Sequence, residues 1–422
     1  MTADPTTQAT VSYAELLRNN RNFRFLWFGQ IASLLGDWFN LVASAALVGL
    51  LTQSGLAVGS LFVVRMLAPF LVSPIAGVVA DRYNRKHILI AADLVRMAVV
   101  LAFLLVRDAG DVWLLYTLTA LQFAVSGFFY PARNSILPEL AGERQLGAMN
   151  ALSAATWSVM LALGAALGGL VAGAWGIYPA FVLDTLTFLL SAALLMQIRM
   201  PSKLATAAAD KTVAASVRQY IDGLRYLREH PDILFISLQK AINSLCLTAG
   251  FQVVMVAVSQ QVFIIGEGGG IGMGLFFGLA GVGTGIGPIL ARKLTGDHGP
   301  TLRKAIVVGY LISVLGSAAT APLFNLPVVL LATIVRAVGG GIIWVFSTQL
   351  LLQNVSGRVH GRVFASEFMF FYLGSALASS VIGAALDSSL SISAIIWWMT
   401  GLSVVPMTLW TLSVLRSKRQ EA

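Results

Sequence analysis

The chain has 422 residues, of which 57% are hydrophobic and only 11% are charged, and its mean hydropathy is +0.81. Soluble globular proteins carry about 25% charged residues, so this composition excludes an ordinary soluble domain and predicts a membrane protein. The formal net charge is +9, and the single cysteine, Cys246, excludes an internal disulfide and a cysteine metal cluster.

Twelve apolar stretches follow one another along the chain, and each is long enough to cross a bilayer as a helix, which takes about 20 residues. They lie near 25–51, 57–80, 88–106, 112–130, 146–173, 178–198, 233–263, 269–291, 302–321, 326–350, 363–386 and 392–415. Lipid offers the backbone no hydrogen-bond partners, so such spans are expected to be helical. The sequence therefore predicts an all-α protein with twelve transmembrane helices, located in the plasma membrane.

The lysines and arginines divide unequally between the two sets of connections. Of the 28, 23 lie on the termini and on the connections that share their side, Arg107 alone lies on the opposite side, and four lie within spans. Connections rich in lysine and arginine stay in the cytoplasm, so both termini are predicted to be cytoplasmic. Because topology accounts for the positive charge, no nucleic-acid partner is expected.

Residues 199–232 interrupt the spans and divide them six and six. The expected segments are a cytoplasmic tail (1–24), a six-helix bundle (25–198), this linker (199–232), a second six-helix bundle (233–415) and a basic cytoplasmic tail (416–422). Between Val217 and Leu227, apolar residues recur at helical spacing, and Pro231 follows. This pattern predicts an amphipathic helix on the cytoplasmic membrane surface, with a helix that binds a partner protein as the alternative.

A burst of charge separates the second and third spans. It reads Gly-x-x-x-Asp-Arg-x-x-Arg-Lys and comprises Gly77, Asp81, Arg82, Arg85 and Lys86. This pattern resembles the signature between helices 2 and 3 of the major facilitator superfamily of transporters, although Asn84 stands where that family usually has glycine. The resemblance implies two six-helix repeats around a midplane cavity, and a gate in which Asp81 meets the N-terminus of a helix from the other half. A solvated basic turn is the alternative.

Few charged residues lie inside the predicted spans away from their ends. They are Asp37, Arg65, Asp93, Arg96, Asp184, Lys240, Arg336 and Glu367. A charge at the bilayer centre costs about 2.5–3.5 kcal/mol on insertion scales, so each should face a cavity or a partner. Asp93 and Arg96 share a helix face and are expected to neutralise each other. Lys240 is expected to reach the cytoplasmic membrane surface. We interpret these three residues and Arg65 as structural charges.

The remaining charges, Asp37, Asp184, Arg336 and Glu367, are candidates for carrying a proton or binding substrate. Polar neighbours of Asp37 extend the candidate set to Gln30 and Asn40. The resemblance implies that helices 1, 4, 7 and 10 line the cavity, so Asp37 and Arg336 are expected to face it and to form a proton or substrate switch. A buried structural ion pair is the alternative.

Three further stretches resemble a bacterial branch of the superfamily that holds enterobactin exporters and macrolide efflux proteins. They begin at Asn22, at Pro131 and at Gly223. The stretch Gly164–Gly169 keeps the glycines of an exporter motif and replaces its proline with Ala165, and Arg336 to Gly339 resembles a motif associated with proton coupling. The resemblance implies export of a small amphiphilic molecule, by proton-coupled antiport.

Other function classes fit the sequence less well. The four histidines are far apart on connections, so no metal site or catalytic triad is indicated. The glycine-rich stretch Gly281–Gly287 lacks the ending of a phosphate-binding loop. We therefore expect a monomeric transporter without enzyme activity, cofactor or metal, whose partners are a small-molecule substrate, a proton and the lipid bilayer. The alternatives are a lipid or lysophospholipid transporter of the same fold and a non-transporting membrane receptor or scaffold.

Overall fold

The computed structural model describes residues 12–141, 145–199, 213–296, 298–355 and 359–421. The first half holds α1 (Tyr13–Asn19), α2 (Arg21–Thr52), α3 (Gly55–Arg82), α4 (Arg85–Ala102), η1 (Phe103–Leu105), η2 (Ala109–Asp111), α5 (Val112–Leu140), α6 (Leu146–Ala174) and α7 (Ile177–Met196). After α8 (Val213–Glu229) come α9 (Pro231–Asn243), η3 (Ser244–Thr248), α10 (Ala249–Gln261), η4 (Glu267–Gly269), α11 (Gly270–Thr295), α12 (Gly299–Thr320), α13 (Leu326–Asn354), α14 (His360–Leu386) and α15 (Ile392–Glu421).

Twelve helical spans in the described part of the chain are long and apolar enough to cross a membrane, which confirms the predicted all-α fold with twelve spans. The seventh span, Pro231–Gln261, is built from α9, η3 and α10 in succession. Its middle piece, η3, is a π-helical segment in which the Ala249 N–H donates to the Ser244 carbonyl. Such segments are rare inside α-helices and are often found at functional sites.

The predicted end of the fourth span was wrong. The sequence ended this span near residue 130, which left Arg133 in the following connection, whereas α5 continues through Pro131 and Pro138 to Leu140. Arg133 is buried on this extension, and its guanidinium donates to the side-chain oxygen of Gln30 at 2.6 Å. The helix can therefore continue past the apolar stretch with a buried arginine, because a side chain of α2 accepts a hydrogen bond from the Arg133 guanidinium.

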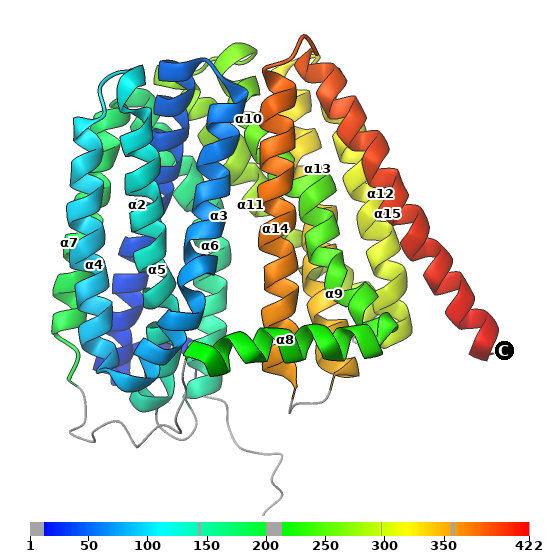
Figure 1. Cartoon of the computed structure of the whole chain (residues 1–422), viewed down its shortest axis with the longest axis horizontal. Helices are drawn as coiled ribbons and strands as arrows, with labels where there is room; N and C mark the ends of the chain where they lie inside the picture. Colours follow the sequence, from blue (N-terminus) through cyan, green and yellow to red (C-terminus); the bar gives the residue numbers. More distant parts are fainter. Residues whose placement is uncertain (1–11, 142–144, 200–212, 297, 356–358, 422) are drawn as a thin grey trace, which may run out of the picture.

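The two six-helix bundles stand side by side, with α2–α7 in one and α9–α15 in the other (Figure 1). The helix α8 lies across one end of the molecule, drawn at the bottom in Figure 1, and we call this end the linker end. We call the opposite end the Ser54 end, after the residue that caps α3 there. The described linker residues thus include the expected helix, while 200–212 lie outside the described part.

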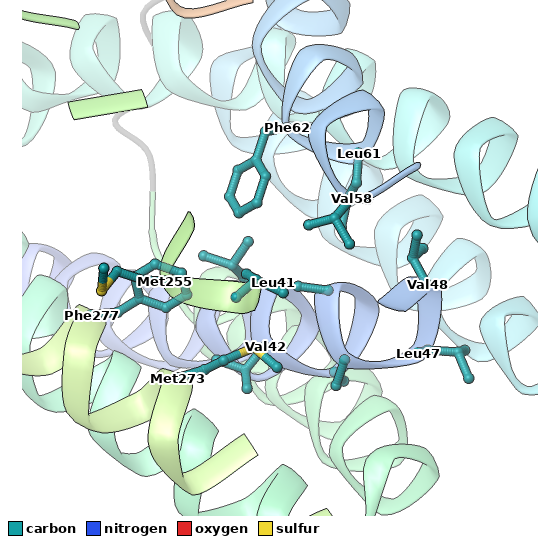
Figure 2. Close-up of a cluster of buried hydrophobic side chains, with 14 of the residues drawn as sticks. Leu41, Val42, Leu47, Val48, Val58, Leu61, Phe62, Met255, Met273 and Phe277 are labelled. Carbon is teal, nitrogen blue, oxygen red and sulfur yellow. The ribbon is translucent and has the colours of Figure 1, made fainter. Parts of the chain in front are cut away.

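Apolar packing joins the two halves at the Ser54 end. One buried cluster there combines Leu41 of α2, Phe62 of α3, Met255 of α10 and Phe277 of α11 (Figure 2). At the linker end, by contrast, the two buried clusters found among the described residues each belong to one half. The structure is therefore sealed between the halves at the Ser54 end.

Glycines allow the helices of opposite halves to approach closely. Where α6 crosses α11, a Cβ atom on Gly169 would lie 2.6 Å from the Gly270 carbonyl oxygen. Where α3 crosses α14, a Cβ atom on Gly55 would lie 2.9 Å from the Gly383 carbonyl oxygen. Small residues at such crossings replace side-chain contact with direct backbone packing, which favours helix association in lipid.

Candidate functional site

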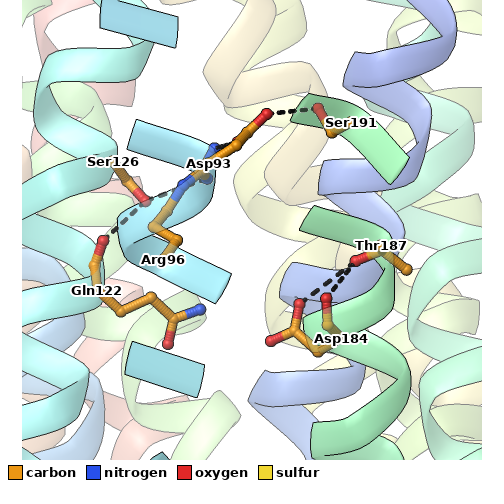
Figure 3. A network of polar contacts seen from close by, with 7 residues as sticks. All are labelled: Asp93, Arg96, Gln122, Ser126, Asp184, Thr187 and Ser191. Atoms are coloured by element: carbon orange, nitrogen blue, oxygen red, sulfur yellow. Dashed lines mark hydrogen bonds and ion pairs between the residues drawn. The ribbon is translucent and has the colours of Figure 1, made fainter. Parts of the chain in front are cut away.

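A buried polar network crosses the first half between α4, α5 and α7 (Figure 3). Asp93 and Arg96 form an ion pair on one face of α4, and both are almost fully buried. Asp93 also accepts a hydrogen bond from Ser191 of α7 at 2.6 Å, and Arg96 donates to Ser126 of α5 at 3.4 Å. The pair expected from spacing thus ties three helices together.

Asp184 of α7 lies against α2 at Gly36. The Thr187 hydroxyl lies 3.5 Å from one carboxylate oxygen of Asp184, while the other oxygen makes no hydrogen bond within 3.5 Å to the described residues and has the Asn40 side chain as its polar neighbour. A Cβ atom on Gly36 would meet both Asp184 and Thr187, so glycine at this position is what admits the carboxyl group. The residue after Gly36 is Asp37, and its carboxyl group interacts electrostatically with that of Asp184 across the contact between α2 and α7.

Asp37 lies midway along α2, partly buried, and its Oδ1 is buried without a hydrogen-bond partner in the described structure. One turn further, Asn40 accepts from Arg65 of α3 at 3.4 Å. The Arg65 guanidinium also lies 4.2 Å from the ring centroid of Phe123. Arg65 therefore faces the same interior as Asp37 and is held by an amide and an aromatic ring.

Five charged residues of the first half interact electrostatically with one another. They are Asp37, Arg65, Asp93, Arg96 and Asp184. Three carboxyl groups face two guanidinium groups, so the fully ionised cluster carries one net negative charge. One bound proton would make the cluster neutral, and neutrality lowers the cost of burying it.

In the second half, Lys240 of α9 forms an ion pair with Glu367 of α14 at 3.0 Å. The Lys240 ammonium lies 4.7 Å from the ring of Trp344 and 5.0 Å from that of Phe368. Both members of the pair are buried, with 2% and 0% of their side chains exposed. The expectation that Lys240 reaches the membrane surface was therefore wrong, because a carboxylate and aromatic rings hold it inside the bundle.

Arg336 of α13 lies on the wall of a cavity of about 190 Å³ that is lined mainly by helices of the second half, with Trp38 and Leu161 contributed by the first half. Its guanidinium donates to the Leu247 carbonyl at 2.8 Å and lies 4.2 Å from the Phe251 ring centroid. Its Nε has no partner, and it forms no ion pair within the described residues. The structure does not bring Arg336 to Asp37, whose charged neighbours all belong to the first half.

The turn between α3 and α4 is held by local contacts. Asn84 accepts from the backbone N–H of Lys86 and so caps α4, and Lys86 donates to the Met196 carbonyl at 2.8 Å. Arg85 forms an ion pair with Glu139 of α5, and Arg82 is exposed. A Cβ atom on Gly77 would meet no neighbour, and the Asp81 side chain lies outside the described part, so the gate remains a prediction.

A contact that the sequence did not predict closes the Ser54 end. Asp387, at the end of α14, accepts from the Ser54 hydroxyl at 2.6 Å and from the Leu56 N–H at 3.1 Å. It also accepts from the Gly55 N–H, so one carboxylate of the second half caps α3 of the first half. Ser54 at the start of α3 could be recognised from the sequence as a helix N-cap, but its partner Asp387 lies 333 residues away in the chain and could not.

The family comparison agrees with this arrangement. The sequence profile described as Major Facilitator Superfamily matches residues 26–379. YfiS, an MFS-type transporter of Bacillus subtilis, is 29% identical over 52% of this chain and 52% of its own. Macrolide efflux protein A of Streptococcus pyogenes is 25% identical over 52% of this chain and 55% of its own. The matched stretch thus spans about half the length of these curated relatives.

Solved structures share the fold over nearly the whole chain. A mutant of the nucleoside transporter NupG superposes with a TM-score of 0.73 at 14% identity, over 93% of this chain and 99% of its own. A bacterial homologue of the iron transporter ferroportin, in an inward-facing state, has a TM-score of 0.71 at 15% identity, over 94% and 98%. The profile match, the twelve spans and the paired bundles lead to one conclusion: this chain belongs to the Major Facilitator Superfamily.

Proposed function

We propose that this transporter exports a small amphiphilic molecule by alternating access, in exchange for protons. The observation that carries the proposal is a cavity in the second bundle that Trp38 and Leu161 of the first bundle border, together with apolar packing that joins the two bundles at the Ser54 end. With both termini in the cytoplasm, the Ser54 end faces outward and the structure corresponds to a state sealed to the outside. Rocking of the bundles would break the packing at one end and form it at the other.

The charge cluster of the first half supports coupling to protons. It holds one more carboxyl group than guanidinium groups, and both Asp37 and Asp184 have a buried carboxylate oxygen without a hydrogen bond to the described residues. Intramembrane acids of this kind commonly form proton relays in transporters. Asp37 is the proposed proton carrier because it is partly exposed, whereas Asp184 is fully buried.

The relatives support export as the direction. Two of the curated proteins similar to this chain are a macrolide efflux protein of Streptococcus pyogenes and a putative bacilysin exporter of Bacillus subtilis. Trp38, Phe251 and Trp344 on the cavity wall provide apolar surface next to the polar side chains of Asn243 and Gln252. A lining of this composition suits an amphiphilic molecule.

The linker helix fits a position on the membrane surface. Asp222 lies 3.8 Å from Arg362 of α14, and a Cβ atom on Gly223 would lie 2.5 Å from the Ser366 hydroxyl oxygen, so one side of α8 packs on the second bundle. Ile221 and Leu224 are 51% and 37% exposed. Apolar side chains on an otherwise charged helix are suited to the bilayer interface.

The test uses purified protein in vesicles that contain a pH-sensitive dye and carry an imposed pH gradient. A panel of amphiphiles, including a macrolide and a catecholate siderophore, is scored for uphill movement coupled to proton flux. Asp37→Asn keeps the shape of the side chain but cannot titrate. We expect this variant to lose uphill transport and to retain downhill exchange, because alternating access does not require the proton.

Full uphill transport by Asp37→Asn would exclude Asp37 as the proton carrier and leave Asp184 and Glu367 as candidates. Asp108→Asn makes the same substitution at an exposed carboxylate outside the cluster and serves as the matched control. Movement of a fluorescent lysophospholipid with no transport of the panel would favour the lipid transporter of the same fold. A protein that moves neither class across the vesicle membrane would point to a receptor or scaffold.

A further inference from the structure

The cavity that Arg336 lines has an uneven distribution of charge. Among its described lining residues, Arg336 is the one with a charged side chain, and no carboxylate lies on the wall. The acids of the first half belong to the separate cluster around Arg65 and Arg96, and Glu367 is paired with Lys240. The cavity therefore presents a single positive charge that no carboxylate neutralises.

Some N–H donors of the Arg336 guanidinium are not used by the hydrogen bonds described. The side chain is 8% exposed, one Nη donates to the Leu247 carbonyl, and Nε has no partner among the described residues. Leaving a charged donor buried and unsatisfied is unfavourable, and an anionic ligand in the cavity would relieve this cost. Its planar fork of N–H groups matches the two oxygens of a carboxylate or a related anion.

The π-helical segment places a second set of polar groups beside this charge. Leu247, whose carbonyl accepts from Arg336, lies in η3, and Ser244 and Thr248 of the same segment line the cavity. Asn243, just before η3, donates to Thr248 at 3.3 Å, while its side-chain oxygen is buried without a described partner. Arg336 can exchange its bond to the Leu247 carbonyl for a stronger one to an anion.

Aromatic side chains form much of the remaining wall of the cavity. Trp38 comes from α2, Phe276 and Phe277 come from α11, and Trp344 comes from α13. The volume of about 190 Å³ is somewhat larger than the roughly 150 Å³ of a cavity that holds benzene. In this state the space therefore fits one ring with a small polar substituent.

We propose that the cavity binds amphiphiles that carry an anionic oxygen group on a ring, with the anion on Arg336 and the ring between Trp38 and Trp344. This assignment rests on the proposed transport function, which it narrows from amphiphiles in general to acidic ones. A cationic amphiphile meets no carboxylate on this wall and is opposed by Arg336.

Binding of three probes of one shape tests the proposal directly. Para-bromobenzoate, para-bromobenzamide and para-bromobenzamidine are negative, neutral and positive, and bromine quenches the fluorescence of a neighbouring tryptophan. Purified protein in phosphatidylcholine nanodiscs is titrated with each. We expect the benzoate to bind about tenfold or more tightly than the benzamide, because a charged hydrogen bond replaces a neutral one, and the benzamidine to bind most weakly.

Variants then test whether Arg336 causes the preference for benzoate over benzamide. In Arg336→Gln the benzoate affinity should fall to that of the benzamide, a loss of about tenfold or more, while the benzamide affinity stays within about threefold. Arg336→Lys should retain part of the preference, because it keeps the charge and loses the fork. Arg218→Gln, which removes an exposed arginine of α8, should change neither affinity.

Equal binding of benzoate and benzamide by the unmodified protein would overturn the proposal, and this measurement needs no variant to fold. An unchanged preference in Arg336→Gln would overturn it as well. Binding is measured without a gradient. A preference for benzoate that depends on Arg336, in a protein that moves no protons, would therefore refute proton-coupled transport and leave the binding proposal standing. Coupled transport of amphiphiles without any preference for anions would refute the binding proposal alone.

Discussion

Removal of the Asp387 carboxylate should open the Ser54 end of the transporter. This carboxylate accepts from the Ser54 hydroxyl and from the N–H groups of Gly55 and Leu56, and it is the cap that the second half gives to α3. Ser54 remains as the N-cap of α3 in Asp387→Ala, so the loss is that of an anion near the helix N-terminus, about 0.3–1 kcal/mol, and of its hydrogen bonds to the first N–H groups, comparable to a side-chain cap at about 0.5–2 kcal/mol. Since the site is exposed, we take about 1–2 kcal/mol for Asp387→Ala.

A difference of about 1–2 kcal/mol changes an equilibrium constant about 5- to 30-fold. If the Ser54 end is open in about 3% of molecules, Asp387→Ala should therefore raise that fraction to between about a tenth and a half of them. Asp387→Asn removes the charge and leaves an acceptor oxygen, so its effect should be smaller. High salt should reproduce part of the effect in the unmodified protein, because screening weakens exposed electrostatic contacts.

The assay is a distance measurement between spin labels at Gln53 and Ser389, which are exposed at this end. Cys246 is buried and free, and its replacement by alanine leaves the two labels as the only thiol sites. Asp108→Ala is the matched control, because Asp108 caps a turn within the first half and makes no contact across the halves that the described structure records. An unchanged distance distribution in Asp387→Ala would refute the reasoning.

Three further changes test the contacts described above. Glu367→Gln should lower the melting temperature strongly, because breaking a buried ion pair by removing one partner costs about 3–5 kcal/mol. Adding Lys240→Met to the same protein should restore most of the lost stability. Equal melting temperatures of the single and double variants would contradict this. Gly169→Val should push α6 away from α11, because overpacking of this kind costs about 1–3 kcal/mol. The distance between spin labels placed on the two halves should then increase. An unchanged distance would argue against close packing at this crossing. Asp81→Asn should slow turnover in the vesicle assay without loss of expression, and wild-type turnover would remove Asp81 from the gate.

Local physics made the fold predictable from the sequence. A span is recognised by its own apolar residues, because each segment must satisfy its backbone inside lipid without help from the others. The Asp93–Arg96 pair was also within reach, since residues three apart share a helix face. The buried charges inside the spans could be picked out for the same reason, because any charge in an apolar stretch is conspicuous, whereas their roles stay predictions.

Tertiary packing decided which of these groups meet. Lys240 finds Glu367 across 127 residues, Arg133 finds Gln30 across 103, and Asp387 finds Ser54 across 333. Each partnership depends on how two helices cross, and small residues such as Gly36 or Gly169 set those crossings by allowing close approach. Spacing along one helix contains no information about such a crossing, so the sequence alone paired Asp37 with Arg336, and the packed bundle placed them in separate polar groups.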